Sequence, residues 1–153
     1  MKQHVSLGAA EAQLAIQVIQ AELVRRGKSA VIAVADDHGE LIGLLRGDGA
    51  PLPSIVIATN KAWTAARDRK PSVELGRASR DPHTGFDMAY YGDTRYIGWG
   101  GGVPVVVAGT VVGAIAVSGL IEAEDMELAG MAAAAVVEAI EKEPAGAGAA
   151  SAR

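Results

Sequence analysis

The chain contains no cysteine among its 153 residues. This absence excludes disulfide bonds, thiolate metal ligands and a cysteine nucleophile. Aromatic residues are also scarce, at 4% of the chain, although 50% of the residues are hydrophobic. Alanine, valine, isoleucine and leucine must therefore form the core, and their small side chains allow helices and strands to approach closely.

Clusters of basic residues are missing as well. The net charge is -4 at pH 7 and no basic run occurs, so little is available to neutralise phosphates and we expect no nucleic-acid partner. Charges or glycines interrupt every apolar stretch, and residues 1–13 lack the apolar centre of a secretory signal. We therefore expect no membrane association and a cytoplasmic location.

The apolar residues that are present follow a clear order of periodicities. They predict helices over 7–26, 53–70, 72–78 and 123–143, and strands over 29–35, 40–46, 103–107 and 111–117. Ser6 is suited to cap the first helix and Gly27 to end it. Two successive hairpins favour antiparallel pairing, and their unbroken apolar runs require cover from helices.

The expected fold is therefore α/β of the α+β type, with a central antiparallel sheet flanked by helices. We expect a single domain over residues 1–143. Residues 144–153 are rich in alanine and glycine and carry no pattern that could pack, which predicts a disordered tail.

A glycine-rich stretch, 98–104, precedes the third strand and includes Trp99, Gly100 and Gly101. Glycines let the backbone approach a ligand closely, but they also suit a tight entry into a strand. Both interpretations stand equally. The stretch is not a nucleotide-binding loop, because it opens a strand rather than a helix and lacks the lysine and hydroxyl residue of a phosphate cradle.

Two cationic side chains are candidates for holding a carboxylate. Arg46 leaves the second strand, and its planar guanidinium suits bidentate pairing, although it can equally pair with Asp48. Lys61 lies on the second helix beside Thr64, where both could border a pocket. A partly buried lysine suits Schiff-base or proton chemistry, whereas the simpler and favoured interpretation is a solvated helix lysine.

Three acidic residues, Glu122, Glu124 and Asp125, open the last helix. A carboxylate beside a cleft can act as a general base, but acidic first turns are common because they suit the helix dipole. The three histidines lack metal-ligand spacing, and we expect no metal site. His83 lies in a loop near the aromatic segment and is the one histidine considered for haem or proton transfer.

In combination these motifs resemble the GlcG/HbpS family (DUF336, haem-degrading-like), which includes the carboxy-terminal part of PduO cobalamin adenosyltransferases. The resemblance rests on RGDGA (46–50), NKAWTAA (60–66) and the segment from GWGGGVPV (98–105) to IEAED (121–125), in that order. It departs from the family pattern at Gly47, Ala116 and Leu120, and in the aromatic-rich segment 80–96.

The resemblance implies a profilin-like or PAS-like fold with a five-stranded antiparallel sheet, and assembly into homo-oligomers from dimer to octamer. Members of the family bind haem or corrinoids, and one relative is a lyase that acts on an arylhydroxylamine in nitroaromatic breakdown. Fold alone does not select among these functions.

Two hypotheses follow. In the first, the chain binds a flat anionic ligand such as haem or another tetrapyrrole, with ligand contacts from Arg46, Thr64, His83, Trp99, Gly100 and Gly101. In the second, the chain is a cofactor-free lyase or isomerase for a small aromatic metabolite, with Glu124 or Asp125 as base and Lys61 or Tyr91 as acid. Both require the arginine loop, the lysine helix, the glycine-aromatic segment and the acidic helix start to meet at one cavity.

Overall fold

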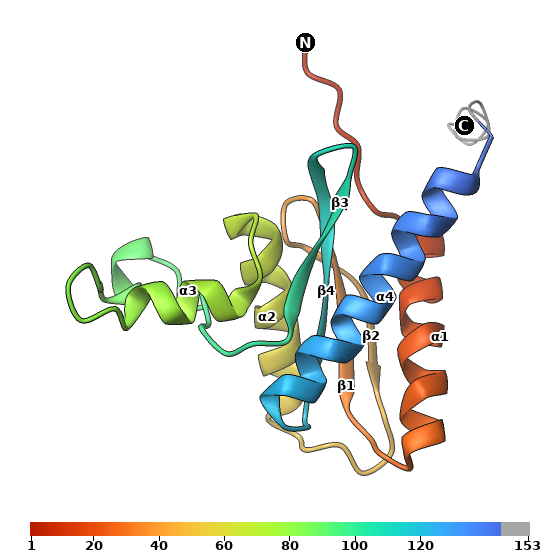
Figure 1. The fold of residues 1–153 in the computed structure, drawn as a ribbon, viewed down its shortest axis with the longest axis horizontal. Coiled ribbons are helices and arrows are strands. Elements are labelled where there is room, and N and C mark those ends of the chain that lie inside the picture. Colours follow the sequence, from red (N-terminus) through yellow and green to blue (C-terminus); the bar gives the residue numbers. More distant parts are fainter. Residues whose placement is uncertain (145–153) are drawn as a thin grey trace.

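The structure is a computed structural model, which describes residues 1–144 (Figure 1). Its elements are α1 (Ala9–Arg26), β1 (Val31–Asp36), β2 (Leu41–Arg46), α2 (Ser54–Asp68), α3 (Ser72–Ser79), a 3₁₀ helix η1 (Met88–Tyr91), β3 (Gly102–Val107), β4 (Thr110–Ser118) and α4 (Glu122–Lys142). The order of helices and hairpins agrees with the sequence-based expectation. The predicted disordered tail lies, apart from Pro144, outside the described residues.

The sheet is antiparallel throughout, in the order β2-β1-β4-β3. The central strands β1 and β4 pair from Val31 opposite Ser118 to Asp36 opposite Gly113. The expected mixed α+β fold is confirmed, but residues 1–144 form four strands rather than five. The segment between α3 and β3 adds no strand, because its glycines, its aspartates and Pro82 fold it into turns and the 3₁₀ helix.

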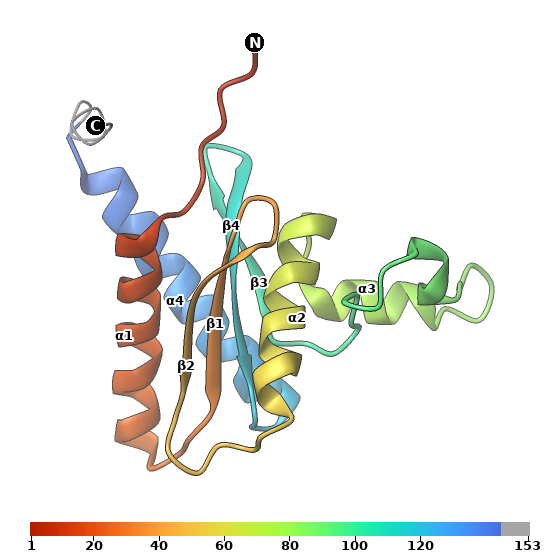
Figure 2. The same cartoon turned by 180° about the vertical axis from the view of Figure 1, so that it is seen from behind.

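Helices cover both faces of the sheet. Helices α1 and α4 pack together on one face, and α2 lies on the other (Figures 1 and 2). Alternate residues of β1 accordingly enter different cores, with Ile32 and Val34 toward α1 and α4, and Val31 and Ala33 toward α2. Because both faces of the central strands are covered, their sequences are apolar at consecutive positions.

The α2 face is packed almost entirely with small side chains. Ala58, Ala62, Ala65 and Ala66 are fully buried, and the helix therefore lies close to the sheet. Contact is so close at the start of β3 that a Cβ on Gly102 would lie 2.2 Å from the carbonyl oxygen of Lys61. The start of β3 therefore lies directly against the backbone of α2 at Lys61.

The segment from α3 to residue 98 projects away from the sheet as an arm (Figure 1). Thr64 of α2 fixes the end of this arm where the chain returns to the sheet. Its hydroxyl donates to the carbonyl of Arg95 and accepts from the amide of Ile97. Tyr96 contacts Trp63 edge-on, with ring centroids 4.6 Å apart. These contacts fix the point at which the glycine-aromatic stretch approaches the sheet.

The start of α1 differs from the expectation. The helix begins after Gly8, whose amide donates to Oε2 of Glu11 at 2.8 Å. Ser6 does not cap it, because its hydroxyl accepts instead from the amide of Asp37 in the β1–β2 turn. Gly27 ends the helix in the left-handed conformation, as predicted. Within residues 1–144, each helix is too short or too polar to cross a membrane.

Candidate active or ligand-binding site

Lys61 is buried in the middle of α2, with 3% of the residue exposed. Its ammonium donates to the carbonyl of Val117 and to Oδ2 of Asp125, both at 3.0 Å. The favoured interpretation of a solvated helix lysine is therefore wrong. Lys61 lies three positions after the buried Ala58 and four before the buried Ala65, so it shares the inward stripe of the helix.

Asp125 in the first turn of α4 is equally buried, with 3% exposed. Its Oδ2 accepts from Lys61 and its Oδ1 accepts from the amide of Leu120 at 3.2 Å. Burial raises the pKa of Asp125, and the opposing effects of Lys61 and the Leu120 amide do not fully offset it. Protonated Asp125 is thus accessible at a higher pH than for an ordinary carboxyl.

The glycines before β3 fit against this pair because they lack side chains. Gly101 has φ 129°, and a Cβ there would lie 2.9 Å from Nζ of Lys61 and 2.6 Å from the carbonyl oxygen of Val117. Gly100 donates its amide to Oε2 of Glu122 at 3.2 Å. The tight-packing interpretation of the glycines therefore accounts for Gly101, whereas Gly100 also reaches an open cavity.

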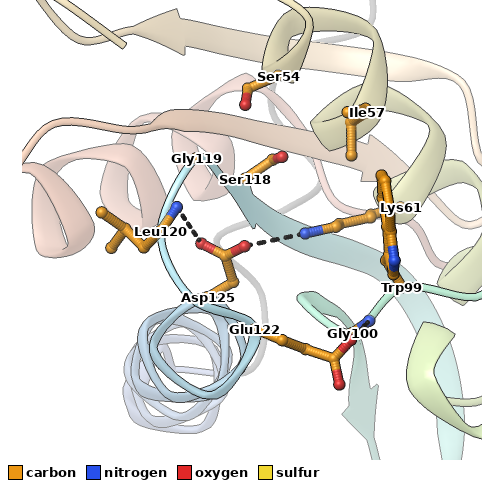
Figure 3. Close-up of a pocket in the computed structure, with 10 residues that line it drawn as sticks. All are labelled: Ser54, Ile57, Lys61, Trp99, Gly100, Ser118, Gly119, Leu120, Glu122 and Asp125. Carbon is orange, nitrogen blue, oxygen red and sulfur yellow. Dashed lines mark hydrogen bonds and ion pairs between the residues drawn. The ribbon is translucent and has the colours of Figure 1, made fainter. Parts of the chain in front are cut away.

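These groups surround a cavity of about 330 Å³, near the lower end of the range for small-molecule sites (Figure 3). Its lining comes from α2, the stretch before β3, the end of β4 and the start of α4, and consists of Ser54, Ile57, Lys61, Trp99, Gly100, Ser118, Gly119, Leu120, Glu122 and Asp125. The ion pair between Lys61 and Asp125 lies in the wall of the cavity, and Trp99 is part of the same lining. The site combines a flat apolar wall with a cation and two carboxylates.

Comparison with known proteins assigns the family. The model of the family described as haem degrading protein HbpS-like matches residues 7–135. The chain belongs to the HbpS-like family. GlcG of Escherichia coli K12 is 36% identical over 118 residues, which cover 77% of this chain and 85% of GlcG.

Solved structures agree with this assignment. ORFY of Klebsiella pneumoniae, a DUF336 protein, superimposes with a TM-score of 0.81 at 26% identity, covering 94% of this chain and 97% of ORFY. A double mutant of Streptomyces reticuli HbpS gives a TM-score of 0.76 at 28% identity, covering 88% and 90%. The HbpS-like fold therefore extends over nearly the whole of this chain.

In this HbpS-like chain, the cavity brings together three of the four elements that the sequence analysis expected to meet. Lys61, Trp99, Gly100 and Asp125 line it, and Gly101 packs behind Lys61. The arginine loop is not among them. Arg46 is exposed at the end of the edge strand β2, and it does not line the cavity.

Other predicted site residues lie elsewhere. Glu124 forms an ion pair with Lys28, on the side of α4 that faces the end of α1. Thr64 is fully buried and holds the aromatic segment. Tyr91 stacks on Tyr96 with ring centroids 4.3 Å apart. These three side chains therefore have partners outside the cavity.

His83 is exposed in the loop between α3 and η1, where its amide donates to Asp81. It does not line the cavity. Five lining residues were not predicted as site residues from the sequence: Ser54, Ile57, Ser118, Gly119 and Leu120. Ser54 follows two prolines at a helix start and Ser118 ends a strand before Gly119, but such positions are common in chains without a site.

Proposed function

We propose that the cavity binds a flat, carboxylate-bearing small molecule of the tetrapyrrole type, such as haem. The observation that carries this proposal is that Lys61 and Trp99 line the same open cavity. An indole face supports a planar ring, and a buried ammonium supports a carboxylate. The description of the family as haem degrading is consistent with this ligand class.

The charge of the cavity defines how a carboxylate would bind. Lys61 and Asp125 neutralise each other, and Glu122 adds a negative charge. An incoming carboxylate must therefore replace Asp125 as the partner of Lys61. The raised pKa of Asp125 favours this exchange, because protonation of Asp125 removes its charge and leaves the ammonium for the ligand.

The fit to haem is partial. The ring and its carboxylates find partners in Trp99 and Lys61, but the residues that line the cavity include no histidine or methionine to ligate iron. The proposal therefore rests on the organic part of the ligand. It predicts that iron-free protoporphyrin IX binds with an affinity similar to that of haem.

The test is a titration of the chain with haemin and with protoporphyrin IX, followed by absorbance and by quenching of tryptophan fluorescence. Saturable binding of both, near one ligand per chain and unchanged in His83→Ala, supports the proposal. Binding of haemin alone, or its loss in His83→Ala, contradicts it, because iron ligation at the exposed loop would then hold the ligand.

A second candidate function is supported by the buried ion pair itself. A carboxyl group with a raised pKa next to an ammonium suits proton transfer. The chain would then be a cofactor-free lyase or isomerase for a small aromatic metabolite, for example an arylhydroxylamine, with Asp125 as base and Lys61 as acid. Loss of turnover in Asp125→Asn, with turnover retained in Glu124→Gln, would support this function over the first.

The chain is further proposed to act as a homo-oligomer. Trp99, which lines the cavity, is 57% exposed, and Ile121, which lies between the lining residues Leu120 and Glu122 in the chain, is 68% exposed. A second copy that covered these side chains would remove apolar surface from water and enclose the ligand. Light scattering coupled to size-exclusion chromatography tests this proposal, and a monomeric mass at micromolar concentration would contradict it.

A further inference from the structure

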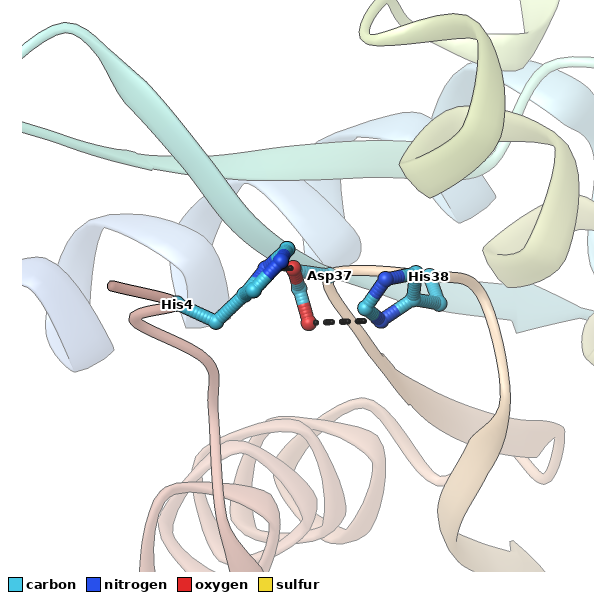
Figure 4. Close-up of side chains that lie close together, drawn as sticks. All are labelled: His4, Asp37 and His38. Atoms are coloured by element: carbon cyan, nitrogen blue, oxygen red, sulfur yellow. Dashed lines mark hydrogen bonds and ion pairs between the residues drawn. The ribbon is translucent and has the colours of Figure 1, made fainter. Parts of the chain in front are cut away.

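Two histidines meet a buried aspartate at the turn between β1 and β2 (Figure 4). None of these three residues lines the cavity that contains Lys61. Nδ1 of His4 lies 3.1 Å from Oδ2 of Asp37, and Nδ1 of His38 lies 3.2 Å from Oδ1. The three ligand atoms all lie within 4.8 Å of one another. The sequence analysis expected no metal site, because the three histidines lack metal-ligand spacing.

The surrounding backbone holds the three groups in place. The amide of Leu7 donates to the carbonyl of Val112 at 2.8 Å, which ties the segment that carries His4 to β4. Ser6 accepts from the amide of Asp37 at 3.0 Å. On the other side, Oδ1 of Asp36 accepts from the amides of His38 and Glu40 and so closes the turn. The cluster is therefore built by two separate segments of the chain.

The carboxylate of Asp37 is buried, and its two oxygens face His4 and His38. Both imidazoles are open to solvent, with side chains 63% and 58% exposed. An ion can therefore reach the cluster without any movement of the fold.

We propose that His4, Asp37 and His38 bind a divalent transition-metal ion such as Zn²⁺. Two imidazoles and one carboxylate form a typical donor set for these ions. Bonds of about 2.0 Å in a tetrahedral site place neighbouring donor atoms about 3.3 Å apart. Each imidazole nitrogen here lies 3.1 or 3.2 Å from a different oxygen of Asp37, and one donor atom from each residue lies within 4.8 Å of the others. Rotation of the exposed rings can shorten the remaining separation between the two imidazoles.

Two arginines near the cluster affect which metal ions we expect it to bind. Arg67 donates to the carbonyl of His38 and Arg69 donates to the carbonyl of Val111, and Arg69 shares a surface cavity with His4 and Asp37. Their positive charge opposes every cation, but only a transition ion gains strong bonds to imidazole nitrogen. We therefore expect Zn²⁺ or Co²⁺ to bind, and Mg²⁺ and Ca²⁺ not to bind.

The experiment is calorimetric titration of the untagged, metal-free chain with Zn²⁺, with Mg²⁺ as the comparison ion. His4→Ala and His38→Ala each remove one ligand from an exposed position. His83→Ala is the matched control, because it removes an exposed histidine from a distant loop. Absorption of the Co²⁺ form reports the coordination of the ion directly.

Saturable binding of one Zn²⁺ per chain, unchanged in His83→Ala and at least about tenfold weaker in His4→Ala and in His38→Ala, is the expected result. Equal Zn²⁺ affinity in all three variants, or no saturable binding by the unaltered chain, overturns the proposal. The three side chains would then serve only as a hydrogen-bonded tie between the amino-terminal segment and the turn.

Discussion

The ammonium of Lys61 and the carboxylate of Asp125 lie 3.0 Å apart, and each side chain is only 4% exposed. They come from helices on opposite faces of the sheet and meet at the end of β4. There the carbonyl of Val117 accepts a hydrogen bond from the same ammonium. A buried pair of this kind adds little net stability, but loss of one partner leaves an uncompensated charge. In the proposed function, this pair is therefore the charged centre of the site.

The first prediction concerns the stability of this pair. Lys61→Met should lower the free energy of unfolding by about 3 kcal/mol at pH 7, because Asp125 would remain buried without a counter-charge. The raised pKa of Asp125 means that the native state takes up this proton more readily than the unfolded state. The loss should therefore shrink as the pH falls through that pKa and the carboxyl becomes neutral.

Urea unfolding of both proteins between pH 4 and pH 8 measures this dependence. The double variant Lys61→Met with Asp125→Leu serves as its control, since it removes both charges and should recover most of the lost stability. A cost for Lys61→Met that is independent of pH would show that packing, rather than charge, is responsible.

A second prediction concerns the glycine behind Lys61. Gly101→Ala should destabilise the fold strongly, because its φ of 129° is unfavourable and its Cβ would lie 2.6 Å from the carbonyl oxygen of Val117. Gly109→Ala is the matched control, with φ 77° and no atom within 4 Å of its Cβ. Comparable denaturation midpoints for the two variants would rule out close packing at Gly101.

The third prediction separates a structural from a ligand-binding role for Thr64. Thr64→Val should lower the free energy of unfolding by about 1 to 3 kcal/mol, since the amide of Ile97 loses its acceptor in a buried site. Thr59→Val is the control, because the Thr59 hydroxyl only donates to Ile55 in its own helix. We expect unchanged protoporphyrin affinity in both, and a selective loss of affinity in Thr64→Val would place this hydroxyl at the ligand.

A fourth prediction addresses the wall of the cavity. Trp99→Ala should weaken protoporphyrin binding by about tenfold through loss of ring stacking, with little change in the stability of a single chain because Trp99 is 57% exposed. Tyr90→Ala is the control, since Tyr90 is 86% exposed and outside the lining. Oligomeric mass is measured for both variants, and an equal affinity would exclude Trp99 from the site.

Much of the fold could be predicted because its signals are local. Gly27, Pro71 and the β1–β2 turn set the limits of elements through backbone conformation alone. The number of strands was wrong because the fifth came from family resemblance, whereas the residues after α3 carry turn-forming types. Local sequence patterns also predicted Ser6 rather than Gly8 as the cap of α1. The hydroxyl of Ser6 is instead bonded to the amide of Asp37, which is distant in the sequence.

The residues of the candidate site were harder to predict from the sequence. Helical spacing places Lys61 on the same stripe as Ala58 and Ala65, and closer attention to that stripe would have predicted its burial. Spacing could not have paired Lys61 with Asp125, 64 positions away. Likewise, nothing in the sequence brings His4 to His38, because the contact depends on how the amino-terminal segment crosses β4.

The central claim is that a ligand carboxylate replaces Asp125 as the partner of Lys61, and Asp125→Asn tests it most directly. The dissociation constant of protoporphyrin IX is measured for this variant and the unaltered chain across the pH range in which both stay folded. We predict that affinity for the unaltered chain increases as the pH falls, because protonation of Asp125 frees Lys61. Asp125→Asn should bind about tenfold more tightly at the upper pH, with no such dependence. Weaker binding by Asp125→Asn, or the same pH dependence in both proteins, would contradict this account.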